Sequence, residues 1–191
     1  MTKTRVTWGR TLRVGSIMVL VSAVALGVAA STYFAGTSSS TVPLAASWAK
    51  GYTTITALKQ DADLAVDGTV SRVVSVTKDS KNLVFTDYSI SVRSVAHNPR
   101  KIAVSAEIIV HQTGGIVGNT KFELTDDPLF AIGEHVILFL QQYGPDHYFV
   151  IGGPTGRFQV QNGVVKAVSL DGVKLAADIT EESFLAAISS A

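Results

Sequence analysis

The stretch LAVDGTVSRVVSV, from Leu64 to Val76, decides the fold class because apolar and polar side chains alternate along it. The residues expected on its buried face are Val66, Val70, Val74 and Val76. Those expected on its outer face are Asp67, Thr69, Ser71 and Ser75. A repeat of two residues is the pattern of a β-strand that is buried on one side. The stretch therefore predicts a long, half-buried strand.

Two segments that follow continue this alternation. In NLVFTDYSISVRSV, residues 82–95, the apolar positions are Val84, Tyr88, Ile90 and Val92. In KIAVSAEIIV, residues 101–110, they are Ile102, Val104, Ala106, Ile108 and Val110. Turn-forming residues stand between the segments, at Lys81–Asn82 and Asn98–Arg100. Three alternating strands with no helical pattern between them predict an antiparallel meander.

The segment HVILFLQQ, residues 135–142, differs because Val136 to Leu140 are apolar without alternation. Such a strand is buried on both faces, as in a small closed barrel that a helix covers. Further short strands are predicted in HYFVIG, GRFQVQ and VVKAVSL. Tight turns are predicted at Asn162–Gly163 and Asp171–Gly172.

A short helix is expected on each side of these strands. TITALKQDAD, which begins at Thr54, places Ile55, Leu58 and Ala62 on one helical face. At the other end of the chain, DITEESFLAAISSA offers the capping residues Asp178 and Thr180, then Glu181 and Glu182, then an apolar stripe of Phe184, Leu185 and Ile188. The predicted fold is mainly β, a small antiparallel barrel of about five to seven strands with short N- and C-terminal helices.

The first residues have the layout of an export signal. Residues 1–13 are basic and free of acids, and residues 14–35 are apolar and uncharged. They predict either a signal peptide cleaved near Ala30 or an uncleaved transmembrane helix that keeps the basic end in the cytoplasm. Residues 36–49 are small, polar and proline-containing, which predicts a flexible tether. Residues 50–191 are then an extracytoplasmic barrel domain.

Composition excludes several classes of function. Four of the 16 basic residues lie in the first 13 positions, which leaves 12 against 15 acidic residues in the rest of the chain. A body of that charge is not expected to bind nucleic acid, because phosphate binding needs clustered Lys and Arg. The chain has no cysteine, which excludes disulfides, thiolate zinc sites and cysteine nucleophiles. No cofactor is predicted.

Five sequence segments together resemble a known group of proteins. They are ADLAVDGTV, VFTDYSISV, HQTGG, DDPLFAIGEHVILFL and RFQVQNGVV. Their order resembles that of exported, membrane-tethered bacterial proteins, largely without known activity, whose domain is similar to an OB-type barrel. The resemblance covers about Ile55 to Val168 and implies an OB-like fold. It implies no catalytic residues, because the shared motifs are glycines and core strands.

Adjacent carboxylates at Asp126 and Asp127 are candidates for an acid–base pair or for ligands of a hard cation. The alternative is a turn in which an aspartate caps the segment PLFAIG, because Pro128 favours an extended residue before it. Neighbouring side chains on an extended segment point apart, which favours the turn. The histidines, His97, His111, His135 and His147, are scattered without a metal-binding spacing, so no metal site is predicted from them.

Glycine-rich loops and exposed aromatic residues are the remaining candidates. Gly114 and Gly115 can offer backbone N–H groups to an anion. Arg157 follows a second glycine-rich loop and can contact a ligand there. The alternative explanation for both loops is an ordinary hairpin loop or a bulge. Tyr143 and Tyr148 lie beside a predicted loop tip, where they can stack on a sugar or peptide or pack beneath a helix.

Three functions are open at this level. The first is a non-catalytic module of the cell envelope that binds a protein, peptide or glycan at the barrel face. The alternative is an extracytoplasmic hydrolase or metal-dependent enzyme that uses Asp126, Asp127 and a histidine. The third is a purely structural envelope subunit. An enzyme predicts that Asp127, His111 and His135 meet in one cleft, whereas a binding module predicts a concave, partly aromatic face.

Overall fold

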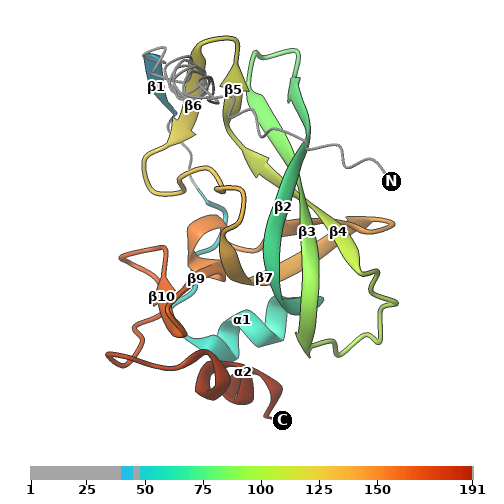
Figure 1. The fold of residues 1–191 in the computed structure, drawn as a ribbon, viewed down its shortest axis with the longest axis vertical. Helices are drawn as coiled ribbons and strands as arrows, with labels where there is room; N and C mark the ends of the chain where they lie inside the picture. Colours follow the sequence, from blue (N-terminus) through green and yellow to red (C-terminus); the bar gives the residue numbers. More distant parts are fainter. Residues whose placement is uncertain (1–39, 45–47, 191) are drawn as a thin grey trace, which may run out of the picture. The chain divides into compact units, whose positions relative to one another are not determined.

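The computed structural model describes residues 40–44 and 48–190, and five of its strands close into a barrel (Figure 1). They are β2 (Leu64–Lys78), β3 (Val84–His97), β4 (Glu107–Thr113), β7 (His135–Gly144) and β8 (His147–Val150). Around the ring the order is β7, β2, β3, β4, β8 and again β7. The β4–β8 pair is parallel, and the other neighbours in the ring are antiparallel. The predicted mainly β barrel is thus confirmed.

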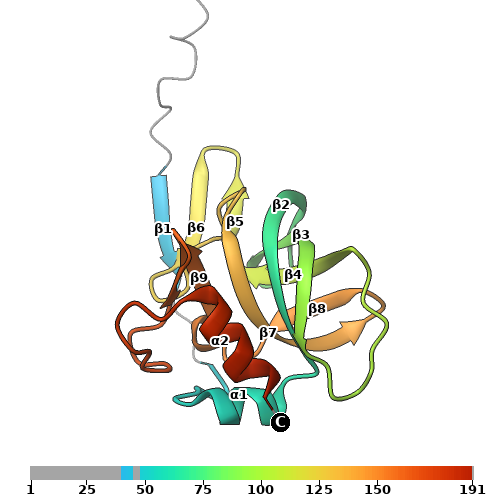
Figure 2. The same cartoon turned by 60° about the horizontal axis from the view of Figure 1, so that its bottom comes forward.

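Two helices and a short sheet extension cover one side of this barrel. The elements are α1 (Ile55–Asp61), the 3₁₀ helix η1 (Gly153–Gly156), β9 (Arg157–Gln161), β10 (Val164–Ala167) and α2 (Glu181–Ser189). β9 continues the sheet from β7, and β10 follows β9 through the predicted Asn162–Gly163 turn. Figures 1 and 2 show α1 and α2 together at one end of the barrel. Both flanking helices were predicted.

Two apolar cores explain the unbroken run in β7. Val136, Leu138 and Leu140 face the barrel interior, whereas Ile137 and Phe139 face the outer layer that the helices cover. All five side chains are fully buried. Leu58 of α1 joins the outer core, together with Phe184 and Ile188 of α2. The prediction that this strand is buried on both faces is confirmed.

Irregular pairing along β2 corrects the predicted faces of that strand. Its register with β3 shifts between Val70 and Arg72 and again between Val73 and Ser75. A bulge adds one residue and moves the following side chains to the other face. Val74, which lies between the two shifts, is therefore 45% exposed rather than buried. The second shift restores the original alternation, and Val76, which pairs with the buried Thr86, is nevertheless 38% exposed.

Near the start of β2, Asp67 was predicted on the outer face, but it is buried beneath the helical layer. Ala65, two residues earlier, is buried on the same side.

The third predicted strand begins later than its sequence pattern indicated. β4 starts at Glu107, and residues 101–105 form no strand. Asn98 accounts for this, because its side chain bonds both the N–H and the carbonyl of Ile102 and holds the chain in a loop. Val104 still packs against the barrel interior as predicted, whereas Ala106, which was also predicted to be buried, is exposed.

A second, three-stranded sheet was not predicted. It contains β1 (Ser40–Leu44), β5 (Gly115–Val117) and β6 (Thr120–Leu124), with β1 parallel to β6. Figures 1 and 2 show it at the end of the barrel opposite α1. Ser40–Leu44 lies within the segment predicted as a tether, so a flexible linker does not describe these five residues. β5 and β6 form the hairpin that the glycine-rich HQTGG loop had suggested.

The predicted signal or anchor segment, residues 14–35, lies outside the described residues. Within residues 40–44 and 48–190, no helix has the length and apolar character needed to cross a bilayer.

Candidate binding cleft

A cleft of about 220 Å³ opens beside β4 and β8. Residues from β4 and β8 meet there with the loop before β7 and with the segment before α1. Its lining includes Trp48, His111, Gln112, Asp127, Phe130 and Phe149. Pockets for drug-sized ligands usually measure about 300 to 1,000 Å³, so this cleft suits a single ring or side chain. Most of its lining surface is apolar.

Aromatic side chains, two of them exposed and two half-buried, continue from this cleft across the outer surface of the barrel. We call Phe85, His111, Tyr143 and Phe149 the aromatic row. Phe85 stacks on His111 at a centroid distance of 5.0 Å, and Tyr143 stacks on Phe149 at 6.0 Å. The edge of Tyr143 meets His111 at 6.2 Å. The row therefore forms one connected aromatic surface, part of which is the rim of the cleft.

Strand register explains why these residues meet. Asp87 on β3 pairs with His111 on β4, and His111 pairs with Phe149 on β8. Their neighbours in the strands, Tyr88 and Val110, point into the barrel. Tyr143 and Phe149 are 52% and 39% exposed. Tyr143 is thus placed as the binding prediction requires.

The prediction of an exposed stacking residue is wrong for Tyr148, because this side chain is completely buried in the barrel interior. It precedes Phe149 on the same strand, and successive strand residues point to opposite faces. The tyrosine packs in a core, but in the barrel interior rather than beneath the helix.

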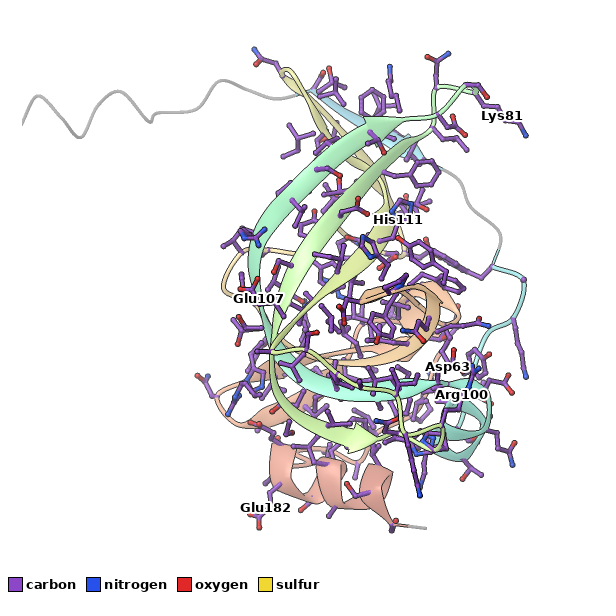
Figure 3. All side chains as sticks on the ribbon, turned by 90° about the vertical axis from the view of Figure 1, so that its right-hand side faces the viewer. Asp63, Lys81, Arg100, Glu107, His111 and Glu182 are labelled. Carbon is purple, nitrogen blue, oxygen red and sulfur yellow. The ribbon has the colours of Figure 1, made fainter. Side chains whose placement is uncertain are left out.

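His111 is held by Asp87. Its Nδ1 lies 2.6 Å from Oδ1 of Asp87, and the hydroxyl of Ser75 donates to Oδ2 of the same carboxylate at 2.8 Å. Partial burial raises the pKa of Asp87, but these two hydrogen bonds outweigh it and leave the pKa below its usual value. With Nδ1 engaged, Nε2 of His111 has no hydrogen-bond partner among the described residues and is available to a ligand. In Figure 3, His111 lies between the turn that carries Lys81 and the pair formed by Asp63 and Arg100.

Trp48 closes the cleft from the segment before α1. Its indole N–H donates to Oδ2 of Asp126 at 3.1 Å. The indole ring covers Gly153, where even a Cβ atom would lie 2.5 Å from it. Asp126 therefore positions an aromatic side chain, while Asp127 points into the protein. The prediction that these two neighbours point apart is confirmed.

Arg157 and Asp127 belong to a buried ion cluster. Nη2 of Arg157 donates to both carboxylate oxygens of Glu134, at 2.8 and 3.0 Å, and Nη1 lies 3.3 Å from Oδ1 of Asp127. Arg157 is 1% exposed and its guanidinium lies 3.9 Å from the ring centre of Phe130. Burial raises the pKa of Asp127, and the Arg157 charge offsets part of that rise. Arg157 is therefore a core residue rather than a surface anion ligand, and Asp127 pairs with it instead of capping a turn.

Gly114 and Gly115 connect β4 to β5 and do not form an open anion cradle. The N–H of Gly114 donates to the carbonyl of Val84 at 2.7 Å, and its carbonyl accepts from the Thr86 hydroxyl at 2.8 Å. Gly114 has φ of +105°, a region that favours glycine. The predicted hairpin lies one step further along the chain, where the turn at Gly118 joins β5 to β6, whereas Gly114 and Gly115 connect the two sheets.

The histidines do not gather in one cleft. Asp127 and His111 share the lining, but His135 contacts Asp67, and His97 contacts the carbonyl of Lys59. Sequence reasoning missed Trp48, Phe85 and Asp87 as site residues. Asp87 and His111 lie 24 positions apart and meet only through the β3–β4 register. The signal that could have found Asp87 is its position directly before the inward-facing Tyr88, since alternation then puts the aspartate on the outer face.

No model of a known protein family matches this chain, and no curated protein matches it.

Proposed function

We propose that this protein is a non-catalytic binding module of the cell envelope, which holds a glycan chain on the aromatic row and in the adjoining cleft. The observation that carries the proposal is the connected surface of Phe85, His111, Tyr143 and Phe149 beside a cleft that Trp48 closes. Flat, exposed aromatic rings stack on the apolar faces of sugar rings. The apolar, uncharged segment at residues 14–35 supports export, either with cleavage near Ala30 or with retention in the membrane.

We also propose that the barrel is OB-like, and the strand order supports this assignment. Counted along the chain, the barrel strands follow the ring order first, second, third, fifth, fourth, with a parallel third–fifth pair. This is the order of the five-stranded OB barrel, whose ligands commonly meet the face of the second and third strands. Phe85 and His111 lie on those strands here, β3 and β4.

A glycan suits the polar groups of this surface better than a charged ligand does. Nε2 of His111 and the hydroxyl of Tyr143 have no protein partner among the described residues, so both can bond a sugar hydroxyl. The charged groups of the cleft are already paired, since Asp127 bonds Arg157. A small cleft beside an open aromatic row fits an extended chain that inserts one ring and stacks the next.

The alternative proposal is a hydrolase or metal-dependent enzyme that uses Asp126, Asp127 and a histidine. The geometry favours binding instead, because the Asp126 carboxylate accepts from Trp48 and the Asp127 carboxylate pairs with Arg157. His111 shares the lining with Asp127, but the histidine is bonded to Asp87. Ser75 donates to Asp87 rather than to the histidine, so it is not placed as an activated nucleophile.

Trp48 supplies the measurement that tests the proposal. The chain has two tryptophans, so a full-length Trp8→Phe protein leaves Trp48 as the sole indole reporter in the cleft. Soluble peptidoglycan fragments and N-acetylglucosamine oligomers are titrated against its fluorescence. We expect saturable binding that weakens about fivefold or more in Tyr143→Ala and Phe149→Ala, because a stacked aromatic contributes about 1 kcal/mol or more.

Leu170→Ala is the matched control, because Leu170 is 87% exposed and does not line the cleft. It should bind as the parent does. Equal binding by the aromatic variants and the control would overturn the assignment to this surface. Binding of peptides but not of either glycan probe would keep the surface and overturn the ligand class. Release of new reducing ends from the oligomers would favour the enzyme.

A further inference from the structure

Three metal-ligating side chains meet where the start of α2 reaches the barrel wall, on the side that the helices cover. They belong to Asp67, His135 and Glu181, and one donor atom from each lies within 4.8 Å of the others. Nε2 of His135 is 2.5 Å from Oδ1 of Asp67 and 3.5 Å from Oε1 of Glu181. Ligands about 2.0–2.2 Å from a tetrahedral zinc ion lie roughly 3 to 3.5 Å apart. The His135–Glu181 distance already matches this spacing, whereas His135 and Asp67, now at hydrogen-bond distance, would have to move apart by somewhat under about 1 Å.

Regular structure holds each of these donors in place. Asp67 and His135 lie on β2 and β7, which pair directly in the barrel. The Asp67 side chain is only 4% exposed. Glu181 is the first residue of α2, and its N–H donates to the carbonyl of Gly163 at 3.0 Å. The site therefore needs no ordering of a loop to bring its donors together.

The Arg93 guanidinium lies against all three of these side chains. Its Nη1 lies 2.6 Å from Nε2 of His135 and 3.5 Å from Oε1 of Glu181. An Nε2 without hydrogen can accept from Arg93 but offers nothing to the Asp67 carboxylate. An Nε2 with hydrogen bonds Asp67 but directs no lone pair at Arg93, and a protonated ring places two cations in contact. Nη1 of Arg93 also lies 3.1 Å from Nδ1 of His135, so the tautomer with hydrogen on Nε2 donates to Asp67 and accepts from Arg93 through Nδ1. A positively charged group therefore already occupies the space between the three donors.

We propose that Asp67, His135 and Glu181 bind a divalent transition-metal ion of the zinc class, which replaces the Arg93 guanidinium. A cation accepts the Nε2 lone pair and an oxygen from each carboxylate, so all three donors are satisfied at once. An imidazole ligand favours zinc over calcium or magnesium, which prefer oxygen ligands. The Arg93 side chain is 51% exposed, so it can move into water at small cost.

The metal joins α2 to the barrel wall in a chain that has no cysteine for a disulfide. Two ligands come from paired barrel strands and the third from the helix. A ligand that binds only the folded state raises its stability. Zinc is therefore expected to raise the melting temperature of the protein as well as to bind it.

Isothermal titration of Zn²⁺ into full-length, chelator-treated protein tests this site, with Co²⁺ absorption as a second readout of coordination. Glu181→Gln is the main variant because Glu181 lies at the edge of the fold, whereas loss of the buried Asp67 endangers folding. We expect one equivalent of Zn²⁺, an affinity about 100-fold weaker in Glu181→Gln, and no binding in His135→Gln.

Arg93→Gln separates a metal site from a simple ion-pair network. Removing the competing cation should tighten Zn²⁺ binding about tenfold, since one positive charge no longer opposes the ion. His97→Gln is the control and should bind zinc like the parent protein. The proposal is overturned if Arg93→Gln binds no zinc, or if Glu181→Gln and His135→Gln bind it as the parent does.

Discussion

At the scale of a single residue, Arg157 was predicted to contact a ligand at the surface but lies in the core. It follows a glycine-rich loop, which suggested a ligand contact, yet it lies beneath the cleft with Glu134 and Asp127. Its Nε has no hydrogen-bond partner among the described residues. A buried ion pair of this kind contributes little over an apolar replacement, but loss of one partner leaves a buried charge unpaired.

Arg157→Ala is therefore expected to lower the free energy of unfolding by about 3–5 kcal/mol, because Glu134 and Asp127 keep their burial and lose their counter-charge. Urea unfolding followed by circular dichroism measures this loss. Arg157→Lys keeps a charge but cannot bond both oxygens of Glu134, so a smaller loss is expected. A loss under about 1 kcal/mol in the alanine variant would show that the carboxylates reach water instead.

The β5–β6 hairpin shows at the scale of an element why glycine is needed after β4. Gly114 turns the chain out of the barrel into the second sheet with φ of +105°. A Cβ atom there would lie 2.6 Å from the carbonyl oxygen of Phe122 in the adjacent strand. Both the backbone angle and the close approach exclude a side chain.

Gly114→Ala is expected to destabilise the protein by about 2 kcal/mol or more, since backbone strain of about 1–3 kcal/mol adds to the clash with β6. Gly118→Ala is the matched control, because Gly118 also has positive φ, +59°, but a Cβ atom added there would meet no atom within 4 Å. Thermal unfolding of both variants separates the two effects. Equal losses would attribute the whole cost to backbone angle and none to the close approach.

At the scale of the whole domain, barrel closure divides the protein into parts of different expected stability. The closed ring places Val136 to Leu140 between two cores, and all five side chains are fully buried. The small sheet of β1, β5 and β6 lacks such a core, and Ser40–Pro43 of β1 are exposed. Segments with few buried apolar contacts open at lower free energy than the global unfolding.

Hydrogen exchange followed by mass spectrometry should therefore find slow exchange in the peptides of β2 and β7 and faster exchange in those of β1 and β6. The paired strands of the barrel lose their protection together, because opening one strand breaks the ring. Protection of β1 equal to that of β7 would contradict this division and would make the small sheet part of the barrel's cooperative unit.

The sequence by itself determined the strand-rich class, the two flanking helices and the double burial of β7. Each of these follows from a local repeat, since a period of two or an unbroken apolar run is read from neighbouring residues. The outward face of Asp87 was also predictable, because it depends on strand geometry alone.

Only the tertiary structure decided what those side chains meet. A bulge in β2 reversed the face of Val74, the β3–β4 register joined Asp87 to His111, and the start of α2 brought Glu181 to His135. A local pattern states which side of a strand a residue occupies. It does not state which distant strand or helix covers that side, because that choice depends on how the whole chain closes.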